Sequence, residues 1–393
     1  MKRFLILPAL VALFCCGNSQ WKISELESPA AGKSGEPFLV SDETGILMSW
    51  IQEESEGNHA LKWARWDGGM WSSAQTIRSK VPFFVNWADF PSIMPLSKES
   101  MAAHWLEKRG QGSYSYHVMI SASSDGGKTW SEPSAPHSDT SENEHGFASL
   151  VDLGNGEFSA AWLDGRMFHA GTPHSPADEM ALMYSKIGTH QEATLDSRVC
   201  DCCQTTAVRT PDGIFVAYRD RSEKEIRDIS YVRFSSGKWS DPQTLYPDGW
   251  QIAGCPVNGP AADAKDRIIV VAWYTGAGGQ GKVQVVFSPD AGASFGKPVQ
   301  VDGGNPSGRV DVVLLNDGSA LVSWLENIKD KGAEIRVRQV FQDGRIAQAL
   351  TVADTSNARA SGFPRMAGFR GDVYIAWTYM SGPARIRVAR IEM

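Results

Sequence analysis

The feature that most constrains the fold is an internal repeat of about 55 residues. A short apolar run that ends in an aromatic residue recurs seven times along the chain. The aromatic residues stand at Trp50, Trp105, Trp162, Tyr218, Trp273, Trp324 and Trp377. Repetition at such a period indicates units that bury their apolar faces only against one another, as in a solenoid or a propeller.

Each repeat carries the signals of four short antiparallel strands. Asn155-Gly156 and Asp212-Gly213 lie between alternating apolar runs, which is typical of β-hairpins. In the second repeat, residues 116–123 and 129–133 supply a third and a fourth strand. Four strands in each of seven repeats predict an all-β fold, a seven-bladed β-propeller with four-stranded antiparallel blades. A six-bladed propeller and an open series of sandwiches are the structural alternatives.

The two ends of the chain are expected to meet in the last blade. After Trp377 there is room for only one strand, residues 384–391. We expect residues 21–27 to supply the missing outer strand, because closing the ring removes the exposed edges that an open sheet must protect. Residues 17–393 are therefore predicted to form a single propeller domain.

Residues 1–16 have the features of an export signal. Lys2 and Arg3 precede an apolar run over residues 4–14, which is too short to span a bilayer. The run ends in Leu13-Phe14-Cys15-Cys16, which resembles a bacterial lipobox with Cys16 as the lipidated residue. Cys15 departs from the small residue usual at that position, so plain cleavage is the alternative. We expect an exported lipoprotein of a bacterial periplasm or outer envelope, held to the membrane only by its lipid.

The charge pattern excludes one class of partner. The net charge is -7 and the chain contains no block of basic residues. Nucleic-acid binding needs a basic stripe that neutralises phosphates. We therefore expect a small molecule, a glycan or another protein as the ligand.

Two segments in phase with the repeat resemble the Asp-box, Ser-x-Asp-x-Gly-x-Thr-Trp, of sialidases and related propellers. Their matching residues are Ser123, Asp125, Gly127 and Trp130 in one segment and Ser288, Asp290, Gly292 and Phe295 in the other. The resemblance implies a structural turn, in which Asp accepts hydrogen bonds and Gly takes a positive φ. It identifies a fold and carries little information about activity.

The resemblance also implies where a ligand would bind. An Asp-box joins the third strand of a blade to the fourth, and the ligand site of such propellers lies on the opposite face, which we call the top face. Alternating strand directions send the connections after second strands and before first strands to that face. Metal-ligand candidates gather there from blades three to five: Cys200, Cys202, Cys203, Cys255, His145, His169 and His174, with His137 in the preceding connection.

Thiolate and imidazole ligands together suit a soft or borderline ion, so copper as Cu(I) or zinc is the predicted cofactor. Disulfides are the alternative in an oxidising compartment, and Cys200–Cys203 with Cys202–Cys255 is the least strained pairing. Buried thiols without either are a third alternative. Our first hypothesis is a non-catalytic binding or assembly role for this cysteine- and histidine-rich part of the top face.

A second hypothesis follows from the resemblance, namely an exo-sialidase or related glycoside hydrolase acting on acidic sugars. Sialidases bind the substrate carboxylate with three arginines and use a Tyr–Glu pair and an Asp for catalysis. The top-face residues that match these roles are Arg219, Arg309, Arg359, Tyr379, Glu326 and Asp164, with Asp89 as another candidate acid. The first blade departs from the family, since Gly35-Glu36-Pro37-Phe38 replaces an Arg-Ile-Pro-like motif. A scaffold stapled by disulfides is the third hypothesis.

Overall fold

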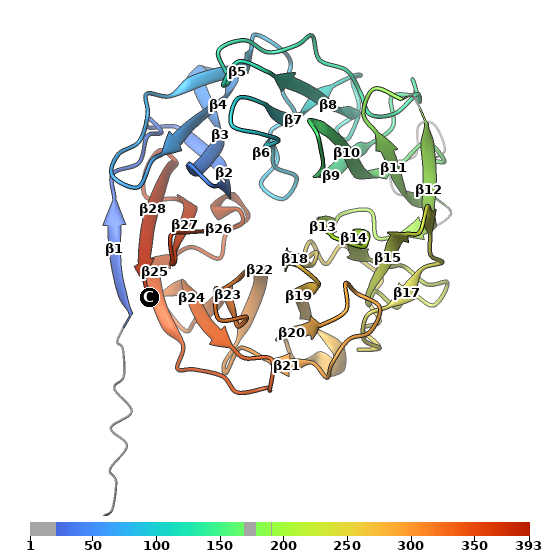
Figure 1. The fold of residues 1–393 in the computed structure, drawn as a ribbon, viewed down its shortest axis with the longest axis vertical. Helices are drawn as coiled ribbons and strands as arrows, with labels where there is room; N and C mark the ends of the chain where they lie inside the picture. The colour runs from blue at the N-terminus through green and yellow to red at the C-terminus, as the bar shows by residue number, and fades with distance from the viewer. Residues whose placement is uncertain (1–20, 169–177, 190) are drawn as a thin grey trace, which may run out of the picture.

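Seven antiparallel sheets surround a central opening in the computed structural model, and the chain passes once around the ring (Figure 1). The structure describes residues 21–168, 178–189 and 191–393. Within these ranges the helical segments are two short 3-10 turns, η1 (Ala277–Gly279) and η2 (Arg359–Ser361). The prediction of an all-β, seven-bladed propeller is confirmed.

The blades follow one another in sequence, and the innermost strand of blades 1 to 6 comes first. Blade 1 contains β2 (Ser34–Asp42), β3 (Gly45–Ser55), β4 (Asn58–Trp66) and β5 (Gln75–Ser79). Blade 2 contains β6 (Ser92–Pro95), β7 (Met101–Lys108) and β8 (Tyr116–Ser123). Blade 3 contains β9 (His145–Gly154), β10 (Glu157–Asp164), β11 (Met180–Lys186) and β12 (Glu192–Val199). Blade 4 contains β13 (Thr206–Thr210), β14 (Gly213–Arg219), β15 (Ile229–Ser235), β16 (Lys238–Trp239) and β17 (Gln243–Thr244).

The remaining blades complete the ring. Blade 5 contains β18 (Ala261–Lys265), β19 (Ile268–Thr275), β20 (Lys282–Ser288) and β21 (Val299–Gln300). Blade 6 contains β22 (Pro306–Leu314), β23 (Ala320–Ile328), β24 (Gly332–Val340) and β25 (Leu350–Thr355). Blade 7 contains β26 (Arg365–Phe369), β27 (Asp372–Tyr379), β28 (Arg385–Glu392) and β1 (Lys22–Leu26).

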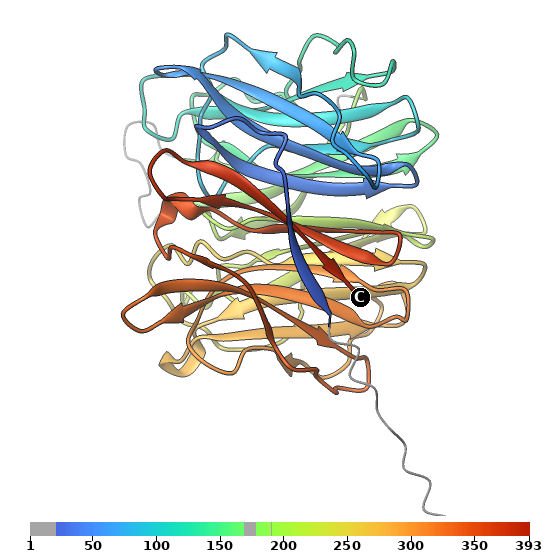
Figure 2. The same cartoon turned by 90° about the vertical axis from the view of Figure 1, so that its left-hand side faces the viewer.

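The N-terminal strand closes the ring as predicted. β1 pairs antiparallel with β28, from Lys22 opposite Glu392 to Leu26 opposite Val388. Figure 2 shows this strand lying beside the last one on the outer rim. Strands from both ends of the chain therefore share one sheet.

Blade 2 departs from the expected four strands. In place of a strand over residues 129–133, its outer edge is reduced to an isolated pairing of Ile120 with Ser134. Ser131 N–H donates to Ala122 O and Ser134 exchanges hydrogen bonds with Ile120, so this edge carries one residue more than β8 between the two contacts, and the bulge interrupts the pairing.

The repeat aromatics form the packing between blades. Each one lies on the second strand of its blade, and all seven side chains are 0 to 2% exposed. Burying an aromatic side chain of 150–250 Å² contributes about 4–6 kcal/mol of transfer free energy. The periodicity of the sequence is therefore the periodicity of the core.

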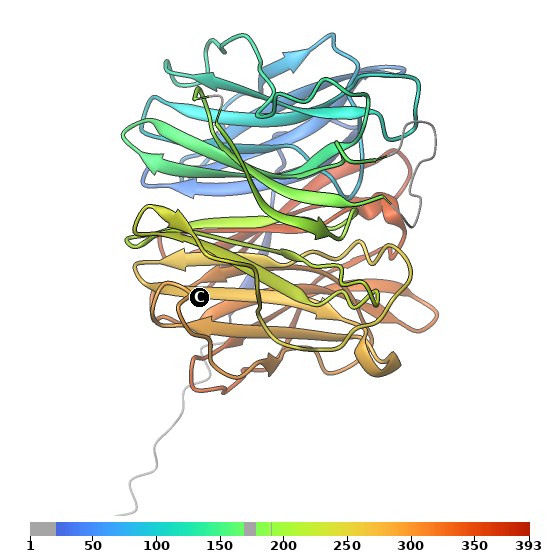
Figure 3. The ribbon, with the colours of Figure 1, turned by 90° about the vertical axis from the view of Figure 1, so that its right-hand side faces the viewer.

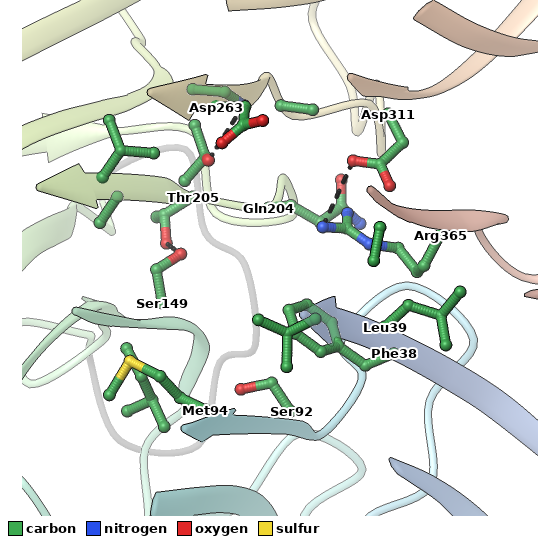
Figure 4. A pocket seen from close by; sticks show the side chains of 18 of the residues that line it. Phe38, Leu39, Ser92, Met94, Ser149, Gln204, Thr205, Asp263, Asp311 and Arg365 are labelled. Atoms are coloured by element: carbon green, nitrogen blue, oxygen red, sulfur yellow. Dashed lines mark hydrogen bonds and ion pairs between the residues drawn. The ribbon is translucent and has the colours of Figure 1, made fainter. Parts of the chain in front are cut away.

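Acidic side chains join neighbouring inner strands around the central opening. Asp263 accepts a hydrogen bond from the Leu314 N–H at 2.8 Å, and Asp311 accepts one from the Met366 N–H at 2.6 Å. The inner strands enclose a cavity of about 400 Å³, into which the pair Asp311 and Arg365 projects at 3.4 Å (Figure 4). The charged groups in this cavity therefore already have partners within the ring.

The strands run between two loop-bearing faces (Figure 3). η1 follows a second strand and η2 precedes a first strand, so both belong to the top face, and Figure 2 shows them on the same side. The four cysteines and Arg359 lie in connections of this kind. Six other candidates lie within strands, because the strands extend further toward the top face than the sequence indicated: Asp164, Arg219, Glu326 and Tyr379 lie in second strands, and His145 and Arg309 lie in first strands.

Candidate functional site

The four cysteines that follow the export signal come together, as the first hypothesis requires. Cys200, Cys202 and Cys203 lie in the connection from β12 to β13, and Cys255 lies in the connection that leads to β18. The Cys200 sulfur lies 3.7 Å from that of Cys202 and 3.4 Å from that of Cys203. Cys255 joins through Cys202, within 4.8 Å. We call these four residues the cysteine cluster.

Burial within the cysteine cluster is graded. Cys200 and Cys203 are each 1% exposed, Cys202 is half-buried, and Cys255 reaches the surface. The cluster therefore has a closed interior and one sulfur that solvent can reach.

The backbone around the cluster is held in place by neighbouring blades. The Cys200 N–H donates to the Arg219 carbonyl at 3.0 Å. The Gln204 side chain donates to the Ala88 carbonyl at 2.6 Å and accepts from the Gly259 N–H at 2.9 Å. The two connections that supply the sulfur atoms are thus tied to each other and to blade 2.

Positive charge accompanies the cluster. The Arg227 guanidinium lies 3.2 Å from the Cys200 sulfur and 3.7 Å from Asp201. Burial opposes ionisation of Cys200, but hydrogen bonds from Cys202 and Cys203 together with Arg227 hold its pKa well below the usual value. The pKa of Cys202 is raised, chiefly by its contact with Cys200, and burial raises that of Cys203. Burial, Arg227 and the contacts among the three sulfurs therefore shift the pKa values of these thiols in opposite directions.

The disulfide alternative is not found in the structure. All four residues of the cluster are present as thiols. The Cys200–Cys203 sulfur separation of 3.4 Å far exceeds the roughly 2.05 Å of a disulfide bond.

His145 was predicted to join the cysteines as a metal ligand, but the structure places it in a different group of residues. His145 lies with His117 and His137, and with the carboxylates of Asp139 and Asp164, rather than in a group with the cysteines. The reason is positional, because His145 begins the inner strand of blade 3 whereas the cysteines follow its outer strand. His169 and His174 lie outside the described residues.

The first arginine of the predicted sialidase triad, Arg219, is bound by main-chain carbonyls. Its guanidinium donates to Asn258 O at 2.7 and 2.9 Å, to Tyr274 O at 2.7 Å and to Arg227 O. It is 1% exposed and lies over the Trp250 ring. These contacts join blade 4 to blade 5.

Arg309 has the same kind of surroundings. It donates to Ser361 Oγ at 2.7 Å, to Gly362 O at 3.0 Å and to Ala358 O at 3.0 Å, and it packs on Trp87. Burial lowers its pKa to about 10. Arg359, in η2, is exposed. Arg219 and Arg309 therefore donate their hydrogen bonds mainly to main-chain carbonyls of the protein. In the part of the chain that the structure describes, neither guanidinium faces an open site for a substrate carboxylate.

The remaining catalytic candidates have structural partners as well. Glu326 accepts the Trp324 indole N–H at 2.7 Å, and Asp164 accepts that of Trp162 at 2.8 Å. The Tyr379 ring contacts the guanidinium groups of Arg385 and Arg387, at 5.3 and 4.9 Å from its centroid, on blade 7. Asp89, the other candidate acid, shares the Tyr116 hydroxyl with Glu144 and accepts the Phe147 N–H.

The indole contacts follow a sequence pattern that the motif search missed. An acid two residues after the repeat tryptophan accepts its N–H in three blades: Trp105 with Glu107, Trp162 with Asp164, and Trp324 with Glu326. Side chains two apart on a strand point the same way, so the spacing itself was the available signal.

Both segments that resemble Asp-boxes form the expected turns. Asp125 accepts hydrogen bonds from Ser123, Thr129 N–H and Thr129 Oγ, and Gly127 has a φ of 80°. The second turn repeats these contacts about Asp290, with Ser288, Ser294 and a Gly292 φ of 80°. Trp130 and Phe295 are half-buried against neighbouring core residues. These turns are structural.

Comparison with known proteins gives the fold. No family model matches the chain, and no curated protein matches its sequence. A protein of unknown function from Dyadobacter fermentans superposes with a TM-score of 0.54 at 14% identity, over 94% of this chain and 99% of that one. An ulvan lyase from a new family of polysaccharide lyases superposes with a TM-score of 0.57 at 12% identity, over 93% of this chain and 95% of that one.

Sialidases are also among the structural neighbours. The Trypanosoma rangeli sialidase superposes with a TM-score of 0.45 at 14% identity, over 94% of this chain and 59% of that one. The chain is a seven-bladed propeller, and the polysaccharide lyase is among its structural neighbours. Within the described parts of the chain, no helix is long and apolar enough to cross a membrane.

Proposed function

We propose that this protein is an exported propeller of the Asp-box kind that binds one soft or borderline metal ion, Cu(I) or Zn(II), at the cysteine cluster. Its role is binding or delivery of the ion rather than catalysis. One observation carries the proposal: four sulfur atoms from two adjacent connections meet on the top face.

The sulfur spacing supports this proposal. Thiolates bound at about 2.3 Å to one tetrahedral ion lie about 3.8 Å apart. The separations from Cys200 to Cys202 and Cys203, 3.7 and 3.4 Å, are close to that edge length. An ion could therefore replace the thiol protons with small movements of the side chains.

Charge and access support it as well. Several thiolates around one ion leave a net negative charge, and Arg227 beside Cys200 offsets part of that charge. The surface position of Cys255 gives an ion a way into the otherwise buried group. A site with one accessible sulfur suits exchange of the ion with a partner protein.

The export signal completes the proposal. Lipidation at Cys16 would hold the propeller at the bacterial envelope, where a metal-binding face serves uptake, delivery or assembly. Mass spectrometry of the membrane fraction tests this part, since a diacylglycerol on Cys16 changes the mass of the N-terminal peptide.

A competition titration tests the metal site. Protein reduced and kept without oxygen is titrated with Cu(I), or separately with Zn(II), against a chromogenic chelator. We expect one ion at the cysteine cluster of each chain, and a roughly 100-fold or greater loss of affinity at that cluster in a Cys202→Ser, Cys255→Ser double variant, because two ligands are removed.

The control is Met167→Leu, which removes an exposed sulfur from the connection between β10 and β11 and should leave the affinity unchanged. Equal affinity in the double variant and the unaltered chain would contradict the proposal. So would a reduced chain that binds neither ion.

A further inference from the structure

Three buried histidines lie against one another between blades 2 and 3. His117 is on β8, His137 is in the connection between the blades, and His145 begins β9. Their ring centroids are 4.0 to 4.7 Å apart. They are 7, 8 and 0% exposed, respectively. We call these three residues the histidine cluster.

One main-chain segment fixes the tautomer of every ring. His117 Nε2 lies 2.7 Å from Ser141 O, His137 Nδ1 lies 3.0 Å from Asp139 O, and His145 Nδ1 lies 2.9 Å from Asn143 O. A carbonyl only accepts, so each of these nitrogens carries the hydrogen of a neutral ring. The lone pairs are then on His117 Nδ1, His137 Nε2 and His145 Nε2.

Two of these nitrogens, on His137 and His145, are buried without a hydrogen-bond partner among the described residues. A buried polar atom left without a partner costs free energy, and such an atom needs an explanation.

His145 Nε2 meets negative charge. It lies 3.0 Å from Asp139 Oδ2 and 3.4 Å from Asp164 Oδ1, with neither contact in hydrogen-bonding geometry. A lone pair facing two carboxylate oxygens is repelled unless a cation lies between them. The cation is either a proton on His145 or a metal ion.

A metal ion accounts for both features, whereas a proton on His145 leaves His137 Nε2 without a partner. One ring nitrogen from each histidine lies within 4.8 Å of the others. Imidazoles that donate their second nitrogen to a carbonyl are the usual arrangement of metal-ligating histidines. Imidazole and carboxylate ligands suit Zn(II) and similar divalent ions.

We propose that His117, His137 and His145 bind one divalent ion of the Zn(II) class, with the Asp139 carboxylate as fourth ligand. Asp164 lies behind this site, where Arg166 binds it at 2.7 and 2.8 Å. The ion fastens the connection between blades 2 and 3 to β8 and β9. The site shares no residue with the cysteine cluster, because its ligands come from β8, β9 and the connection between them.

Zinc analysis in a chain with a disabled cysteine cluster tests this proposal. A Cys202→Ser, Cys255→Ser variant is loaded with Zn(II), dialysed, and examined by elemental analysis and zinc-edge X-ray absorption. We expect one zinc per chain with a first shell of nitrogen and oxygen only. Adding His137→Ala should lower the retained zinc at least tenfold, whereas His59→Ala, a histidine outside the cluster, should not.

Three outcomes would overturn the proposal: no zinc in the cysteine variant, a sulfur-containing first shell, or full zinc retention with His137→Ala. Circular dichroism checks that each variant is folded. If the His137→Ala variant unfolds, the Cys202→Ser, Cys255→Ser variant, whose histidine cluster is unaltered, is loaded with Co(II) and its absorption spectrum is measured instead. A tetrahedral site of nitrogen and oxygen ligands gives strong d–d bands without thiolate charge transfer. Their absence would also overturn the proposal. Failure at the cysteine cluster shows separately, as lost sulfur-bound metal.

Discussion

Arg219→Met separates a structural arginine from a substrate-binding one. In the structure the guanidinium gives its hydrogen bonds to the carbonyls of Asn258, Arg227 and Tyr274, none of which belongs to a ligand. Met keeps an apolar side chain over Trp250 and removes every donor. We therefore expect the substitution to loosen the junction of blades 4 and 5.

The magnitude follows from the three carbonyl oxygens left behind. An unsatisfied buried acceptor costs about 1–3 kcal/mol, and removing a buried charge returns part of that cost. Because the side chain is almost fully buried, solvent does not restore these contacts. We expect the free energy of unfolding to fall by about 2–4 kcal/mol.

Urea unfolding followed by tryptophan fluorescence and circular dichroism measures the change. Arg209→Met is the matched control, because the Arg209 side chain is 51% exposed and its ion pair with Asp152 is long, at 3.9 Å. This control substitution should change the free energy of unfolding by less than about 0.5 kcal/mol. If Arg219→Met matches the control, the guanidinium does not hold the blades together. If the Arg219→Met variant is as stable as the unaltered chain but no longer binds acidic sugars, the sialidase hypothesis is favoured instead.

Two further predictions concern buried acids. Glu326→Ala leaves the Trp324 indole N–H without its acceptor and should cost about 1–3 kcal/mol by thermal unfolding, whereas Glu326→Gln keeps an acceptor and should cost less; equal effects would refute this. Burial raises the pKa of Asp89 to about 7, above its unfolded value near 4, so its stabilising effect is complete below pH 4 and is lost as pH rises through 7. Asp89→Asn should remove a pH-dependent change on the order of 4 kcal/mol in the free energy of unfolding between pH 4 and pH 7. The same pH dependence in the variant and the unaltered chain would contradict this prediction.

The architecture was largely predictable because its signals are periodic. The seven repeat aromatics, the turn residues and the short C-terminal repeat each predicted one feature of the ring, including closure by β1. Local chemistry and spacing are enough for such features. The reduced edge of blade 2 was not predicted, since residues 129–133 were expected to form a strand there.

The site was predictable only in part. Cys200, Cys202 and Cys203 are adjacent in sequence, and Cys255 follows one repeat later, so their meeting could be inferred. The partners of Arg219 and Arg309 are main-chain carbonyls, which side-chain identity does not display.

The histidine cluster was missed for a related reason. His117 is on β8, whereas His137 and His145 come from the next connection and the start of β9. Their contact depends on the register between two blades, which the sequence does not specify. His137 and His145 were noted as top-face residues, but no pattern linked them to His117.

Native mass spectrometry of the reduced, tag-free chain, loaded with Cu(I) and Zn(II) without oxygen, tests the central claim most directly. We predict a mass that corresponds to one ion bound through the cysteine cluster, absent from the Cys202→Ser, Cys255→Ser variant, beside a zinc bound by the histidine cluster in both chains. A chain that instead shows the mass of two disulfides, or of four protonated thiols with no sulfur-bound metal, would contradict the proposed function.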